Sequence, residues 1–178
     1  MKRISALVAG MTAIVLLTSI CQSCSEVSYE KKNDGIVVRL GEKAVYPGQA
    51  VRLKVITDKI IRVTAVPSGE FSETQSLMAL PLPADNVDFT IEKGDGSITL
   101  STSAVSAQVS LSTGEVVFTD NNGTVFLAEQ TGGGKSFSPV TVGGESYFAV
   151  RQQFESPDDE ALYGLGANQT SFMNLKGK

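Results

Sequence analysis

Apolar and polar residues alternate along most of the chain, which is the pattern of a β-strand with one buried face. The alternation is clearest at residues 51–55, where valine and leucine share one face and arginine and lysine the other. After the N-terminal leader, no stretch has a helical period of useful length. Further strands are predicted at residues 35–40, 60–66, 87–92, 97–102, 105–111, 115–119, 124–129 and 148–154. Short strands separated by turns predict an all-β fold, an antiparallel β-sandwich.

Turn residues separate the predicted strands. Residues 58–59 are a two-residue connection between alternating runs, and the Asn-Gly pair at 122–123 is the strongest short hairpin signal in the chain. Pro67 has no N–H to donate and is expected to end the strand before it. Residues 68–86 are irregular and are expected to cross from one sheet to the other.

The glycine run at residues 132–134 is followed by Lys135, as in a phosphate-binding loop. That motif needs another glycine where this chain has Glu129, and a helix after the lysine. Neither requirement is met by the sequence. We predict a flexible hairpin tip instead.

The start of the chain has the features of an export signal. Lys2 and Arg3 precede a mostly apolar stretch, residues 4–20, which is slightly short for a membrane span. Ser23 is a small residue directly before Cys24, as lipoprotein processing requires. The sequence predicts a bacterial lipoprotein, cleaved before Cys24 and acylated there. Such a protein is held in the periplasm or at the outer membrane or cell surface.

This interpretation divides the chain into a signal peptide (1–23), a polar tether (24–34) and a β-sandwich (35–178). Both cysteines fall within the leader region, and the chain contains no histidine. Thiol chemistry in the sandwich, Ser-His-Asp catalysis and imidazole metal ligation are therefore excluded, and we predict no metal site and no cofactor. A net charge of −4 without a basic patch argues against nucleic acid as a partner.

Residues 156–160, S-P-D-D-E, predict a short helical turn in which Ser156 is the N-cap and Pro157 the first helical position. The acidic residues that follow suit the positive end of that turn. They do not form a glycosidase pair, because such carboxyls face each other about 5–9.5 Å apart across the bond. We therefore predict no catalytic residue in this chain.

The segment that follows is the most distinctive of the chain. The string D-E-A-L-Y-G-L-G at residues 159–166, then Asn168-Gln169 and M-N-L-K-G at 173–177, resembles glycoside hydrolases of family 31. These are α-glucosidases and α-xylosidases, and the resemblance is to their N-terminal, galactose-mutarotase-like β-sandwich (a supersandwich). The chain departs from the family pattern at Ala167, where Glu or Gln is usual. The choice between glucose and xylose stays open.

The resemblance implies a non-catalytic domain of an exported α-glycosidase that acts in carbohydrate metabolism. In the family, both catalytic aspartates lie on a (β/α)₈ barrel that follows the sandwich, and such a barrel needs about 250 residues. The domain would support the barrel, whose substrate is an α-linked oligosaccharide, and contribute a loop to the pocket rim. The expected rim residues are Asn168, Gln169, Phe172 and Asn174. Mutarotase activity itself needs a histidine, which the chain lacks.

Aromatic residues of the last segment are candidates for stacking on a sugar. Tyr163 and Phe154 are expected in the core, and Phe172, among polar residues, is the better candidate. A stand-alone, carbohydrate-binding surface lipoprotein is the alternative function, although the absence of tryptophan argues mildly against it. A purely structural or assembly sandwich is the third possible function. We also expect the sandwich to be incomplete at its C-terminus, with an uncovered edge that favours association.

Overall fold

The computed structural model describes residues 28–46, 48–68, 70–72, 74–75, 77–78, 87–164, 166 and 171–177. In these residues the chain forms eleven strands and no helix, which confirms the predicted all-β class. The strands are β1 (Ser28–Lys32), β2 (Gly35–Arg39), β3 (Ala50–Thr57), β4 (Ile60–Val66), β5 (Thr90–Lys93), β6 (Ser97–Ser101), β7 (Val105–Ser110), β8 (Val116–Asp120), β9 (Val125–Ala128), β10 (Lys135–Val142) and β11 (Glu145–Gln152).

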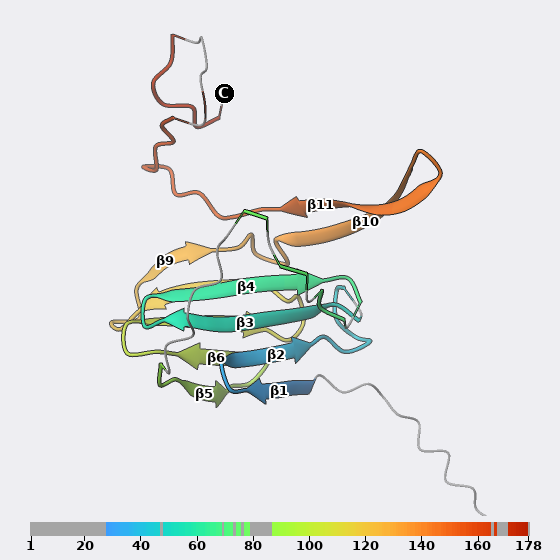
Figure 1. The fold of residues 1–178 in the computed structure, drawn as a ribbon. Helices are drawn as coiled ribbons and strands as arrows, with labels where there is room; N and C mark the ends of the chain where they lie inside the picture. The colour runs from blue at the N-terminus through green and yellow to red at the C-terminus, as the bar shows by residue number, and fades with distance from the viewer. Residues whose placement is uncertain are drawn as a thin grey trace, which may run out of the picture.

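Two antiparallel sheets form the two layers of the sandwich. One sheet has the order β1-β2-β3-β4 and the other the order β5-β6-β7-β8-β9, so that consecutive strands are neighbours throughout. In Figure 1 the first sheet lies in front, with β4 as its upper edge, and the second lies behind it. The hairpin of β10 and β11 lies above both and projects to one side.

The core lies between the two sheets and follows from the alternation in the sequence. On β3 the side chains of Val51 and Leu53 are fully buried, whereas Lys54, between Leu53 and Val55, points to the other face, where it is half-buried. β6 of the facing sheet buries Ile98 and Leu100 in the same way. Removing such side chains from water is the main stabilising contribution to a fold of this kind.

The predicted turns are confirmed where the structure describes them. Asp58 and Lys59 form the turn between β3 and β4, and β4 ends at Val66, directly before Pro67. The Asn122-Gly123 turn joins β8 to β9, and Gly123 has a φ of +82°. The carboxylate of Asp120 accepts hydrogen bonds from the backbone N–H groups of Asn122 and Thr124, both at 2.8 Å. The Asp58-Lys59 turn closes the hairpin of β3 and β4 at the edge of the four-stranded sheet.

The predicted tether at residues 24–34 is wrong for residues 28–32, which form β1. All five residues of β1 are exposed, yet each pairs with a residue of β2. Backbone hydrogen bonds suffice for an edge strand, so a strand of polar residues needs no apolar alternation. The sandwich thus begins before residue 35. Residues 1–27, which include the predicted signal peptide and Cys24, lie outside the described residues.

One prediction about the later part of the chain is also wrong. The loop at residues 131–134 is not a flexible hairpin tip, because a Cβ added to Gly134 would overlap the backbone of Gln153 and approach Glu129 Cβ to 2.9 Å. The loop is clamped instead: Gln130 N donates to Gln153 O (3.1 Å), and Gln153 N donates to Gly134 O (2.7 Å). The short turn predicted after Ser156 is present as a single hydrogen-bonded turn, from Glu160 N to Pro157 O at 3.0 Å.

The sequence patterns predicted β11 but not its partner, β10. The two strands pair over their whole length, from Lys135 opposite Gln152 to Val142 opposite Glu145. The turn between them consists of Gly143 and Gly144, with φ values of +61° and +88°. Two successive positive φ angles match the twist of a hairpin turn and are open to glycine without strain.

Candidate functional site

The C-terminal segment, residues 155–177, leaves the sandwich and forms a separate loop that we call the tail (Figure 1). It departs where Phe154 makes an isolated β-bridge to Glu129. Gly164 and Gly166 lie in the tail with φ values of +85° and +101°. Both glycines of the predicted turn therefore adopt a conformation that other residues rarely reach.

The tail is closed on itself by one of the predicted rim residues. Asn174 Oδ1 accepts hydrogen bonds from the backbone N–H groups of Leu162 and Lys176, both at 3.0 Å. Leu175 N donates to Leu162 O at 2.8 Å, and the Lys176 amine donates to Pro157 O. The carbonyl oxygen of Asn174 is thus used to hold the loop, which is a role that its sequence position did not reveal.

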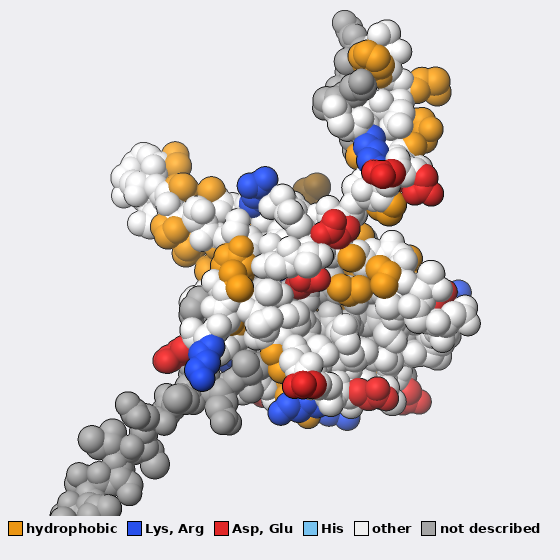
Figure 2. Space-filling view, turned by 180° about the vertical axis from the view of Figure 1, so that it is seen from behind, with side chains coloured by type: hydrophobic (Ala, Val, Ile, Leu, Met, Phe, Trp, Pro, Cys, Tyr) orange, Lys and Arg blue, Asp and Glu red, His pale blue; other side chains and the backbone are white. Residues whose placement is uncertain are grey.

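The aromatic residues of this region are exposed. Phe172 is 55% exposed, as expected for a binding candidate, but Tyr163 is 64% and Phe154 51% exposed. The expectation that Tyr163 and Phe154 belong to the core is therefore wrong. Figure 2 shows hydrophobic side chains gathered along the tail, over β9 and on the projecting hairpin. Asn168 and Gln169 lie outside the described residues, so their assignment to a rim stays a prediction.

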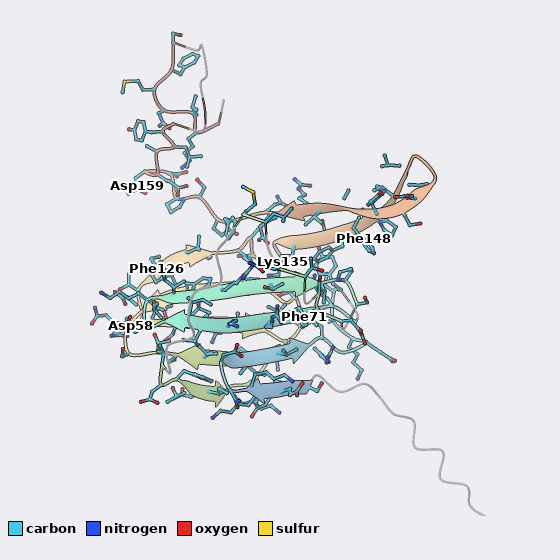
Figure 3. The ribbon with its side chains drawn as sticks, viewed as in Figure 1. Asp58, Phe71, Phe126, Lys135, Phe148 and Asp159 are labelled. Atoms are coloured by element: carbon cyan, nitrogen blue, oxygen red, sulfur yellow. The ribbon has the colours of Figure 1, made fainter. Side chains whose placement is uncertain are left out.

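The acidic cluster of the tail lies at the surface. Asp158, Asp159 and Glu160 are all exposed, and Glu160 accepts a hydrogen bond from the Ser156 hydroxyl. Figure 3 shows Asp159 on the outside of the tail, away from the sandwich. In the described part of the chain, no three acidic, cysteine or histidine side chains are grouped so as to hold a metal ion. In the same part, no helix is long and apolar enough to cross a membrane.

A groove of about 400 Å³ opens between the edge of β4 and the hairpin. Most of its lining is apolar. It is formed by Ile61, Val63 and Ala65 of β4, Phe118 of β8, Leu127 of β9, Lys135 and Phe137 of β10, Val150 and Gln152 of β11, and the flanking residues Glu129 and Phe154. An apolar groove of this size at the edge of a sheet is a surface at which a partner can bind.

A buried ion pair lies on the wall of this groove. Glu129 and Lys135 are 4% and 6% exposed, and the Lys135 amine donates to Glu129 Oε2. The same oxygen accepts a hydrogen bond from Val116 N at 3.1 Å. Burial lowers the pKa of the Lys135 amine, and the bond to Glu129 acts in the opposite direction.

Lys135 is labelled in Figure 3 between β4 and the hairpin. The pair joins the first residue of the hairpin to the end of β9, and so fixes the hairpin to the sandwich. No sequence pattern predicted this pair, since Glu129 and Lys135 are separated by the glycine loop and neither continues an apolar pattern.

Comparison with known proteins points to one family. The model of the glycosyl hydrolase 31 N-terminal galactose mutarotase-like domain matches residues 50–178. The structure is similar to that of a GH31 α-xylosidase from Xanthomonas citri, with 42% sequence identity over 82% of this chain and a TM-score of 0.71. A GH31 α-xylosidase from a soil metagenome, solved with xylose, has 23% identity over 84% of this chain and a TM-score of 0.63, which supports the fold.

The chain accounts for a small part of these enzymes. It covers 15% of the Xanthomonas citri chain and 24% of the metagenomic chain. A third similar structure, an uncharacterised protein from Listeria monocytogenes in complex with glucose, magnesium and calcium, matches 78% of this chain with 18% identity and a TM-score of 0.58. This chain covers 12% of it.

Proposed function

Because the chain belongs to glycoside hydrolase family 31, as its N-terminal galactose mutarotase-like domain, we propose that it is the non-catalytic first domain of an exported α-glycosidase. The observation that carries the proposal is the 42% identity to an α-xylosidase over 82% of this chain and only 15% of that enzyme. The domain supports a catalytic barrel that follows it, and the barrel carries the catalytic groups.

The substrate class of the complete enzyme is an α-linked oligosaccharide, and α-xylosides are the first choice. The relative at 42% identity is named an α-xylosidase, which favours xylose over glucose as the released sugar. The departure at Ala167 leaves α-glucosides as the comparison substrate. Hydrolysis of aryl α-xyloside against aryl α-glucoside by the complete enzyme tests this choice, and a kcat/KM higher on the glucoside contradicts it.

The tail contributes to the rim of the pocket on the leaving-group side. Phe172 offers an exposed ring to the C–H face of a sugar, and Asn168 and Gln169 have amides that both donate to and accept from hydroxyl groups. Asn174 serves the rim by holding the loop closed rather than by contacting the sugar with its carbonyl oxygen.

Kinetics of the complete enzyme test the rim assignment. Phe172→Ala should lower kcat/KM several-fold on a substrate with a long leaving group, and leave a short aryl substrate unaffected. Tyr29→Ala is the matched control, since Tyr29 is also an exposed aromatic residue, at 42%, but lies on β1. Equal kinetic constants for the two variants on the long substrate would show that the tail is only a connection.

Export as a lipoprotein rests on the leader and on Ser23-Cys24. Mass spectrometry of membrane-extracted protein should find an acylated N-terminus at Cys24. Protein that stays soluble with Met1 in place, or membrane attachment that survives Cys24→Ala, would contradict the assignment. The alternative, a stand-alone sugar-binding lipoprotein, requires that the isolated chain binds xylo- or gluco-oligosaccharides, which titration calorimetry measures directly.

A further inference from the structure

The first strand of the sandwich begins very close to the cysteine that the sequence predicts to be acylated. Ser28 is the first residue of β1, so residues 25–27 alone separate it from Cys24. A fully extended chain spans at most about 3.6 Å per residue, so the Cα atoms of Cys24 and Ser28 are at most about 14 Å apart. The tether expected at residues 24–34 is therefore a short one, because residues 28–32 belong to the sandwich.

The start of β1 lies at one edge of the molecule. β1 is the first strand in the order β1-β2-β3-β4, and in the part of the chain that the structure describes its sole neighbouring strand is β2. Ser28 pairs with Arg39, the last residue of β2, so the loop that follows β2 starts beside it. We call β1 and residues 39–46 the anchor edge. In Figure 1, β1 lies at the lower edge of the sandwich and the hairpin of β10 and β11 above its upper edge.

We propose that the anchor edge lies against the phospholipid headgroups of the membrane and is held there by the short tether. This proposal rests on the proposed acylation of Cys24 and adds which surface of the domain meets the lipid. The opposite edge is too far away, since β4 is three strand spacings from β1, or about 14 Å, and the hairpin lies beyond β4. A tether that spans at most about 14 Å cannot pass around the sheet and bring the hairpin to the membrane.

The anchor edge is polar, as a surface that meets hydrated headgroups must be. All five residues of β1 are exposed, and three of them are charged: Glu30, Lys31 and Lys32. Lys43 and Val45 are exposed in the loop that follows β2. Charged side chains on an edge strand, lysine above all, disfavour the addition of another strand. A lipid surface therefore suits this edge better than a further polypeptide strand does.

The charge of the anchor edge also differs from that of the rest of the chain. Residues 28–46 contain four Lys or Arg and three Asp or Glu, whereas residues 47–178 contain nine and fifteen. The anionic phosphates of a membrane attract basic side chains that lie within a Debye length of its surface. The part of the sandwich that the tether brings to the lipid is thus the part without a net negative charge.

Acetylation of lysine residues in the acylated, full-length protein tests the inference. The protein is bound to vesicles of phosphatidylethanolamine and phosphatidylglycerol, and mass spectrometry gives the rate at each lysine. Lys43 should react several-fold more slowly on the vesicles than in the soluble Cys24→Ala variant. Lys59 is the matched control, since it is also exposed but lies in the turn at the other end of β3, and its rate should be the same in both forms. Equal rates at Lys43 in the two forms would overturn the proposal.

A longer tether gives an independent readout. Insertion of about twenty Gly and Ser residues before Ser28 leaves Cys24 in place and adds a flexible linker with a root-mean-square span of about 25 Å. Lys43 should then react as fast as in the soluble variant while the protein stays on the vesicles. A slow reaction that survives the insertion would contradict the role of the short tether.

The mass of the N-terminal peptide tells the two possible failures apart. Protein that is acylated at Cys24 but reacts fast at Lys43 contradicts the anchor edge alone. Protein without an acyl group at Cys24 contradicts the export on which the anchor edge rests. Slow reaction at Lys43 in acylated protein, with Lys59 unchanged, supports both.

Discussion

The molecule has two parts that contain the same kinds of residue in different surroundings. In the closed part, where β2 and β3 face β6 and β7, Val51 and Val109 are fully buried. In the open part, the hairpin and the edges beside it, Val142 and Val150 are 62% and 66% exposed. The difference shows that an apolar strand pattern predicts where a buried face is possible, whereas the partner sheet decides whether it is buried.

The open part holds its shape by other means. Phe137 and Phe148 make an edge-to-face contact across the hairpin, with ring centroids 6.4 Å apart. A two-stranded hairpin alone is marginally stable in water. The backbone bonds between the glycine loop and Gln153, with the Glu129–Lys135 pair, therefore anchor it to the sandwich.

The largest expected effect comes from breaking that anchor. Glu129→Leu leaves the Lys135 amine buried without its carboxylate, and Lys135→Met leaves the carboxylate buried, so each should cost about 3–5 kcal/mol in the free energy of unfolding. The double variant should recover most of the loss, because two apolar side chains leave no buried charge. Urea denaturation of the three variants measures this. Additive losses would show that the pair does not act as a unit.

The next prediction contrasts the loss of stability at a core residue with that at an exposed residue of the hairpin. Leu53→Ala should destabilise the chain by about 2–5 kcal/mol, since a fully buried side chain leaves a cavity. Val150→Ala, at a residue that is 66% exposed, should change stability by less than about 0.5 kcal/mol in this chain. Thermal unfolding of the Leu53→Ala and Val150→Ala variants, measured side by side, tests this contrast. Equal shifts in melting temperature would contradict it.

Two glycines sharpen the comparison further. Gly134→Ala should cost about 1–3 kcal/mol, because the new Cβ meets the backbone of Gln153 and Glu129 Cβ, which cannot move without loosening the hairpin. Gly94→Ala is the control, since its Cβ would come close to Ser97 Oγ, at 3.1 Å, on a side chain that can rotate away, and would lie at an ordinary contact distance, 3.8 Å, from Ser97 O. Gly94→Ala should be neutral within about 1 kcal/mol. Hydrogen exchange in β10 and β11 should increase in the Gly134 variant alone.

The smallest effect concerns the Asp34–Lys54 ion pair of the closed part, at 2.8 Å and more than a third exposed. The hydrogen bond from Lys54 holds the pKa of the Asp34 carboxyl below its usual value of 3.8. A lowered pKa in the folded state stabilises the fold above about pH 4, and the contribution is lost as the pH falls through the folded-state value. Asp34→Asn should therefore cost less than about 1 kcal/mol at pH 7, and nothing once the pH is well below the folded-state pKa. The melting temperatures of the original protein and of the Asp34→Asn variant should converge as the pH falls.

Sequence patterns were a good guide to the closed part and to the type of fold. The alternation on β3, the Asn122-Gly123 turn and the end of β4 before Pro67 all depend on local chemistry that residues show directly. The two glycines of the tail were identified for the same reason, since Gly164 and Gly166 both have positive φ. Strand β1 was missed because an exposed edge strand needs only backbone pairing.

The candidate site was predictable only in part. Phe172 was expected to be exposed, and it is, but the expected burial of Tyr163 and Phe154 was wrong because the described part of the chain leaves more than half of each residue exposed. The loop-closing role of Asn174 depends on Leu162, which is distant in sequence and lies beside it only in the folded tail.

The sequence alone determined the all-β class, the turns and the family, because these depend on periodicity, turn chemistry and a distinctive string of neighbouring residues. Only the tertiary structure decided which apolar faces are covered, and that Glu129 meets Lys135 at the foot of the hairpin. It also decided that Ile61, Val63 and Ala65 line a groove beside the hairpin. Burial and edge bonding depend on which strands lie next to each other, and that arrangement is a property of the whole fold.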